Sequence, residues 1–162
     1  MLIRKLLKIS HTLASIGLAG GLAAYMVALS AAPDISSVEE YAALRRSLAL
    51  VAEWMITPSM VLVLISGLLA LAAFTPYMEA PWVWVKALTG VLIFEATLGS
   101  IDKPAQDAAK AAARVVAGEL PPDALERLVR NEWGAWYAIL ALSAANVILA
   151  IWRPRFGIKK ST

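Results

Sequence analysis

The chain contains a single histidine, His11, the residue type best suited to ligate a metal or move a proton near neutral pH. Its imidazole could serve as an axial ligand to haem iron or as a proton-transfer group. The alternative is a histidine that packs between helices and bonds to a neighbouring backbone or hydroxyl group. Because the chain has no cysteine, it cannot attach haem through thioethers or form a thiolate metal site.

Four more polar side chains interrupt apolar stretches: Glu53, Lys86, Glu95 and Asn146. Lys86 and Glu95 are nine residues apart, so on a helix they point to opposite faces, about 13 Å apart along the axis. Each needs a partner on another helix, a cavity or a ligand. Lys86 could instead extend to the membrane interface. Glu53 could be neutralised by an arginine seven residues earlier, and Glu95 could be protonated or paired with Arg130.

The composition decides which solvent surrounds these groups. Of the 162 residues, 60% are hydrophobic and 17% are charged, and the mean hydropathy is +0.68. A water-soluble domain of this size needs a more polar surface. The net charge is +3, but the basic residues sit at the ends of apolar runs rather than on a basic face with interleaved aromatics. We therefore exclude nucleic acid as a binding partner and expect a lipid bilayer to surround the protein.

Three stretches lack Asp, Glu, Lys and Arg: residues 9–33, 54–78 and 133–152, which are 25, 25 and 20 residues long. Each is long enough to cross about 30 Å of hydrocarbon as a helix. Residues 80–101 are apolar apart from Lys86 and Glu95, and we interpret them as a further span whose charges face protein rather than lipid.

The sequence therefore predicts an all-α fold, an integral membrane four-helix bundle in one domain over residues 1–162. The predicted spans lie at about 7–31, 48–74, 81–101 and 133–152. A long, partly helical extracytoplasmic loop over residues 102–132 should join the third span to the fourth.

Basic residues flank the first and last spans, at Arg4, Lys5 and Lys8 and at Arg153, Arg155, Lys159 and Lys160. This pattern predicts that both termini are cytoplasmic, at a bacterial inner membrane. His11, Lys86 and Asn146 should then share a cytoplasmic layer, and Glu53 and Glu95 an outer layer.

Small residues and a proline give the expected helix contacts. Gly17 and Gly21 form a GxxxG pair, which lets the first span pack closely against a neighbour. Thr57-Pro58 should kink the second span, because proline lacks a backbone donor.

Short motifs along the chain resemble a superfamily of four-helix bacterial membrane proteins. The matching segments are Lys8-x-x-His11 with Gly20-Gly21-Leu22, Ser66-Gly67-Leu68, Trp82-Val83-Trp84-Val85-Lys86, Arg130-Asn131-Glu132 and Arg153-Pro154. The superfamily includes the HemJ-type protoporphyrinogen oxidases, the CopD-type domains and related integral membrane proteins of no assigned function. Leu18 stands where a Trp is usual, and the loop 102–132 is longer than that of the oxidases, so the chain resembles the last branch most.

The resemblance implies a protein that binds haem b or handles a porphyrin, with His11 as the iron ligand, Lys86 as its essential and catalytic partner, and Asn146 near a propionate or substrate. Electrons would pass to a quinone or a respiratory partner. One alternative is an accessory or assembly subunit of a larger membrane complex, or a homo-oligomer. Another is a small transporter that uses Glu53, Glu95 and Lys86 as a polar path.

Overall fold

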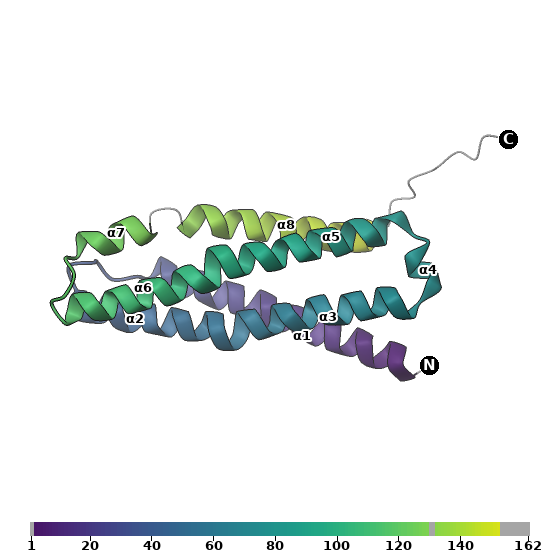
Figure 1. Ribbon diagram of the computed structural model, residues 1–162, viewed down its shortest axis with the longest axis horizontal. Helices are drawn as coiled ribbons and strands as arrows, with labels where there is room; N and C mark the ends of the chain where they lie inside the picture. Colours follow the sequence, from purple (N-terminus) through teal and green to yellow (C-terminus); the bar gives the residue numbers. More distant parts are fainter. Residues whose placement is uncertain (1, 130–131, 153–162) are drawn as a thin grey trace.

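The computed structural model describes residues 2–129 and 132–152, and in these residues every regular element is a helix (Figure 1). In chain order the elements are α1 (Leu2–Ser30), α2 (Val38–Val51), η1 (Ala52–Ile56), α3 (Thr57–Ala73), α4 (Thr75–Met78), α5 (Pro81–Thr97), η2 (Leu98–Asp102), α6 (Lys103–Val116), α7 (Asp123–Val129) and α8 (Glu132–Trp152). The label η marks a π-helix, whose turn is wider than that of an α-helix. The predicted all-α class is confirmed.

Four helical stretches of the described residues are long and apolar enough to cross a membrane, and they contain α1, α3, α5 and α8. Leu2 and Trp152 lie at the same end of the molecule as α4, and we call this the terminal end (Figure 1). The opposite end, formed by α2, α6 and α7, is the far end. The predicted four-helix membrane bundle is confirmed, and the predicted loop contains α6 and α7, with α6 continuing the rod begun by α5.

Each of the two longest rods contains a π-helical segment, and each segment ends just before a proline. η1 precedes Pro58 and η2 precedes Pro104. A proline ring clashes with the carbonyl four residues earlier and cannot donate to it, which disrupts a regular α-helix. A wider turn before the ring relieves this clash. The disturbance expected at Thr57-Pro58 is therefore a π segment, after which the helix continues.

Two glycines allow α1 to lie close against η1 and α3. A Cβ added at Gly17 would lie 2.6 Å from Ser59 Oγ, and one at Gly21 would lie 2.9 Å from Ile56 Cγ1. Both distances are shorter than van der Waals contact, so only glycine fits at this separation of the helices. The predicted close packing of the GxxxG pair is what the structure shows.

Replacing Gly21 with leucine is expected to lower the free energy of unfolding by about 1–3 kcal/mol, because the new side chain must displace a packed neighbour. That neighbour, Ile56, is 0% exposed and cannot move into open space. The unfolding midpoint in mixed detergent and SDS micelles measures the effect. Gly134→Leu is the matched control, since nothing lies within 4 Å of a Cβ at Gly134. Equal midpoints for the two variants would contradict the assigned packing.

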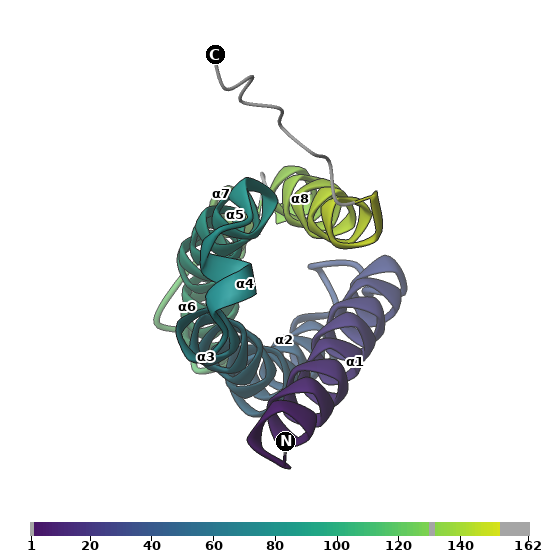
Figure 2. The same cartoon turned by 90° about the vertical axis from the view of Figure 1, so that its right-hand side faces the viewer.

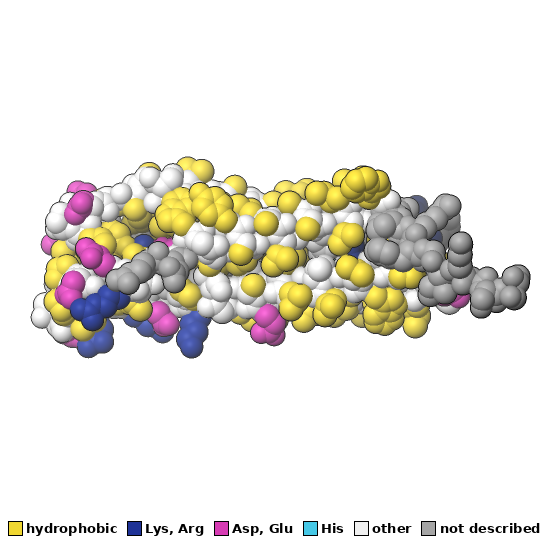
Figure 3. All heavy atoms as spheres, turned by 90° about the horizontal axis from the view of Figure 1, so that it is seen from above, with side chains coloured by type: hydrophobic (Ala, Val, Ile, Leu, Met, Phe, Trp, Pro, Cys, Tyr) yellow, Lys and Arg dark blue, Asp and Glu magenta, His cyan; other side chains and the backbone are white. Residues whose placement is uncertain are grey.

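Apolar side chains cover the middle of the molecular surface, while Lys, Arg, Asp and Glu gather at the far end (Figure 3). The main core lies inside the far half of the bundle. Its members come from all four membrane-crossing rods: Leu22, Tyr25, Leu29, Leu48, Ala52, Ile56, Met60, Ile93, Ile101, Ala105, Trp136 and Ile139. A smaller cluster joins α2 to α6 and α7: Tyr41, Ala111, Ala112, Val115 and Leu125.

Candidate functional site

The half of the bundle nearest the terminal end, which we call the terminal half, buries few side chains. Among the described residues α1 buries none before Ala14, α5 none before Ile93, and α8 none after Ile139. In the same half α3 buries Ser66 and Leu71. The ring of α1, α3, α5 and α8 in Figure 2 therefore surrounds a packed core only in its far half. Because protein interiors are normally close-packed, the terminal half is the part of the bundle suited to hold a bound group.

His11 lies in the terminal half, and its ring is fixed against α3. Its Nδ1 is 3.0 Å from the carbonyl oxygen of Val63 and 3.0 Å from Ser66 Oγ. A carbonyl oxygen can only accept a hydrogen bond, so Nδ1 carries the proton and Nε2 is left as an acceptor. Nε2 has no hydrogen-bond partner among the residues that the structure describes. This arrangement is typical of a histidine whose second nitrogen binds a metal, and it also serves a packing histidine.

Gly67 and Lys86 are the neighbours of this imidazole from α3 and α5. A Cβ at Gly67 would lie 3.4 Å from His11 Cε1, so the glycine of the Ser66-Gly67-Leu68 motif lets the ring lie close to α3. Lys86 is half-buried and near enough to His11 to interact with it electrostatically. His11 and Lys86 therefore lie within electrostatic reach of each other. The stripe that contains Lys86 faces the bundle, since Ile93 and Thr97 on it are buried.

Asn146 on α8 carries a buried side-chain oxygen without a partner. Its Oδ1, and Ser143 Oγ nearly one turn earlier, are both inaccessible and make no hydrogen bond to the described residues. Buried polar atoms are nearly always paired, with protein, water or a ligand. The structure shows no contact of Asn146 with His11 or Lys86 in its described parts, but it gives Asn146 the unmet hydrogen-bonding capacity that a bound polar group would need.

The two glutamates predicted to share an outer layer lie apart. Glu53 is exposed on η1 and accepts a hydrogen bond from Gln106 Nε2 at 3.4 Å. Gln106 comes eleven residues after Glu95, which is about 16 Å of helix, so Glu53 lies well beyond the depth of Glu95. The prediction that both charges of the third span face protein is wrong for Glu95, which is exposed on the outer surface of α5. Lys86, nine residues earlier, lies on the opposite face of the helix and is half-buried.

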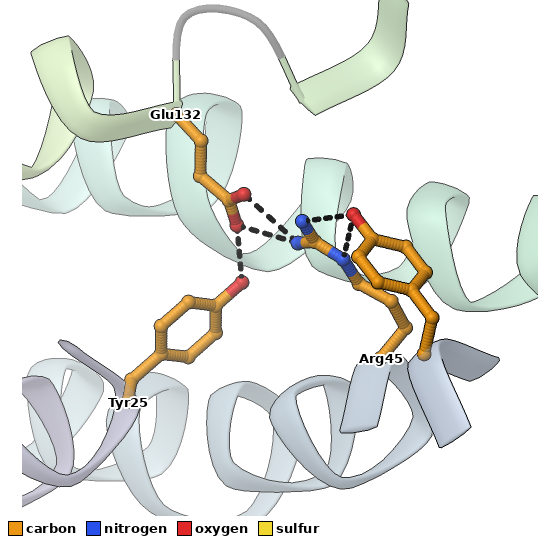
Figure 4. A network of polar contacts seen from close by, with 4 residues as sticks. Tyr25, Arg45 and Glu132 are labelled. Carbon is orange, nitrogen blue, oxygen red and sulfur yellow. Dashed lines mark hydrogen bonds and ion pairs between the residues drawn. The ribbon is translucent and has the colours of Figure 1, made fainter. Parts of the chain in front are cut away.

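A second polar cluster, absent from the sequence-based expectations except for Glu132, lies at the far end of the bundle (Figure 4). Arg45 Nη1 donates to both carboxylate oxygens of Glu132, at 3.0 and 2.8 Å. Tyr25 Oη donates to Glu132 Oε1 at 2.8 Å, and Tyr41 Oη accepts from Arg45 Nε and Nη2 at 2.9 and 2.6 Å. Arg45 is 3% exposed and Glu132 10%. This network, which we call the Arg45–Glu132 cluster, joins α1, α2 and α8.

The sequence does carry a signal for the arginine of this cluster. Tyr41, Arg45, Leu48 and Ala52 recur at intervals of three or four, the spacing of one helix face, and all four are buried. A charge on an otherwise apolar stripe indicates a buried ion pair. Glu132 was expected from the Arg130-Asn131-Glu132 motif. Arg130 and Asn131 lie outside the described residues, so the predicted pairing of Arg130 with Glu95 also lies outside them.

The donor set allows haem but no metal centre of several protein ligands. In the parts of the chain that the structure describes, no group of three His, Cys, Asp or Glu side chains could hold a metal ion. Haem needs less from the protein, because its porphyrin fills four positions around the iron and one imidazole can supply a fifth. The Nε2 of His11, which has no hydrogen-bond partner among the described residues, is the one imidazole nitrogen available for such a role.

Comparison with known proteins gives one family. The sequence model of a family described as "Predicted integral membrane protein (DUF2269)" matches residues 5–154, which is nearly the whole chain. No curated protein and no solved structure matches the chain. The matched range contains the second, third and fourth membrane-crossing rods and all but the first three residues of the first. It also includes His11, Lys86, Asn146 and both residues of the Arg45–Glu132 pair.

Proposed function

The chain belongs to the family of predicted integral membrane proteins designated DUF2269. From the residues of the terminal half we propose that it binds haem b within the bilayer and acts as an electron carrier. His11 is the proposed iron ligand, and the terminal half of the bundle is the proposed haem site. The observation that carries this proposal is the His11 ring, which is fixed through Nδ1 by Val63 and Ser66 and keeps Nε2 unbonded among the described residues.

The chain's own residues have defined tasks at this site. The Val63 carbonyl, which accepts from Nδ1, fixes the tautomer and orientation of the imidazole and raises the basicity of Nε2. Lys86 supplies a positive charge in the same layer, suited to a propionate or an anionic substrate. Asn146 Oδ1 offers an unused acceptor on α8. The haem supplies one-electron transfer when bound, and a quinone within the bilayer is the proposed electron partner.

The orientation of the proposed site follows from the basic residues. Arg4, Lys5 and Lys8 lie at the start of α1, and Arg4 stacks over the Phe74 ring at 5.3 Å, which ties this end of α1 to the end of α3. By the positive-inside rule we propose that the terminal end faces the cytoplasm of a bacterial cell. The haem site would then lie in the cytoplasmic half of the inner membrane.

Purified protein from cells supplied with ample haem is expected to show a Soret band with equimolar haem, and His11→Ala is expected to lose it. Ser66→Ala leaves the Val63 carbonyl as acceptor for Nδ1, so it should weaken haem binding by about tenfold without abolishing it. Haem titration followed by absorbance measures both effects.

Glu53→Gln is the matched control, since Glu53 is exposed and lies outside the terminal half. Its Soret band should equal that of the unmodified protein. A colourless preparation from haem-supplied cells would overturn the proposal, and so would an unchanged band in His11→Ala.

A further inference from the structure

The outward face of α5, continued by Gly99 at the start of η2, is an apolar stripe with one acid in it. Trp84, Leu88, Leu92, Glu95 and Gly99 are all exposed, with Trp84 53%, Leu88 62% and Leu92 51% exposed. Their intervals of three and four residues place them in one line along the helix. At Gly99 nothing lies within 4 Å of an added Cβ, so this position leaves open space next to Glu95. We call these five residues the α5 outer face.

With the third span predicted to begin at residue 81, Glu95 lies at the depth of hydrocarbon. It comes fourteen residues after Pro81, where α5 begins at the terminal end, so it sits about 21 Å along the helix. A bilayer core is about 30 Å thick, which leaves Glu95 about 9 Å inside the far boundary. Acidic side chains at this depth almost always face protein and have a partner.

The chain itself offers no cation to Glu95 within its described parts. No ion pair or hydrogen bond of Glu95 occurs among them, and Lys86 lies on the opposite face of the same helix. In residues 9–30, 47–73, 81–102 and 133–152, which form the membrane-crossing parts of the rods, the only Lys or Arg is Lys86, which lies about 13 Å nearer the terminal end than Glu95. A second copy inserted in the same direction would therefore bring only another Glu95 to this depth.

We propose that the α5 outer face docks a transmembrane helix of a different protein, and that this helix carries a Lys or Arg at the depth of Glu95. Charge complementarity favours this class of partner, since neither lipid tails nor a second copy offers a cation to the carboxylate. Gly99 lets the partner backbone approach closely, as small residues do at membrane helix contacts. Leu88 and Leu92 provide the apolar contact on the terminal side of Glu95. This inference does not depend on haem binding.

The test uses the full chain in lipid vesicles with a fluorescent label, together with a labelled leucine–alanine transmembrane peptide. One peptide carries a single Lys about a third of the way in from one end, and the reference peptide carries Leu there. Energy transfer should show that the Lys peptide binds about 3- to 20-fold more tightly, the range typical of polar contacts between membrane helices. Glu95→Leu should remove this preference.

Glu53→Leu is the matched control, because it removes another exposed glutamate that lies off the α5 outer face and should keep the preference. Equal binding of the two peptides would overturn the proposal, as would a preference that survives in Glu95→Leu. Energy transfer between two labelled copies of the chain that is lost in Gly99→Leu would assign the face to a second copy instead, and would also overturn it.

Discussion

Replacing Glu132 with alanine is expected to lower the free energy of unfolding by about 3–5 kcal/mol, the range found when one partner of a buried ion pair is removed. The Arg45 guanidinium is 3% exposed, and Glu132 provides its only carboxylate among the described residues. The Glu132→Ala variant would leave Arg45 with Tyr41 alone, and it would also remove the acceptor of the Tyr25 hydroxyl. Both losses fall on the junction of α1, α2 and α8.

The unfolding midpoint in mixed detergent and SDS micelles measures this loss. Glu119→Ala is the matched control, because the Arg114–Glu119 pair is 57% and 58% exposed and such pairs contribute about 0–1 kcal/mol. The double variant Arg45→Met/Glu132→Leu should recover most of the stability, since an apolar pair of similar volume carries no desolvation cost. Equal effects of Glu132→Ala and Glu119→Ala would show that the Arg45–Glu132 cluster is not buried in the membrane protein.

The bundle could be predicted from the sequence because the signal is local. A helix must satisfy its own backbone hydrogen bonds in lipid, so the length of a charge-free run is enough to mark a span. The opposite orientation of Lys86 and Glu95 also follows from helix geometry alone. Both predictions need no knowledge of which helix lies beside which.

The continuation of α5 into α6 was not predicted, since Pro104 looks like a helix boundary. The structure carries the rod past this proline through η2, as it carries α2 into α3 through η1 before Pro58. Whether a proline ends a helix or is accommodated by a π segment depends on the packing around it. The two π segments contact each other, which is tertiary information that the sequence does not show.

The candidate site was predicted only in part, for a similar reason. His11 and Lys86 stand out as single polar residues in apolar stretches, and in the structure they lie within electrostatic reach of each other. Arg45 and Glu132 are 87 residues apart, and the carboxylate acquires its partner only when α2 and α8 meet. Glu95 was assigned to the interior by a rule about charges in membranes. That rule applies to complete assemblies, and the partner helix proposed above would restore it for Glu95.

Replacing Trp136 with alanine should be the other strongly destabilising change, by about 3–5 kcal/mol, because it opens a large cavity in the far half. Trp136 is 0% exposed and lies against the Tyr25 ring at 4.5 Å between centroids. Its Nε1 is buried and has no acceptor among the described residues. Trp136→Phe keeps most of the volume and removes this unpaired donor, so it should cost less than about 1.5 kcal/mol. A Phe variant as unstable as the Ala variant would show that the indole N–H has an acceptor in the membrane, such as a bound water.

The two destabilising changes should not be independent, because Tyr25 links them. Glu132 accepts from the Tyr25 hydroxyl, and the Trp136 ring lies tilted against the same tyrosine ring. Residues that share a partner typically show coupling energies of about 0.5–3 kcal/mol in a double-mutant cycle. The cycle of Glu132→Ala with Trp136→Ala should therefore give a smaller combined loss than the sum of the single losses, since either change already frees Tyr25. Strictly additive losses would mean that the far-half core and the Arg45–Glu132 cluster stabilise the protein independently. Tyr25 would then not couple the two.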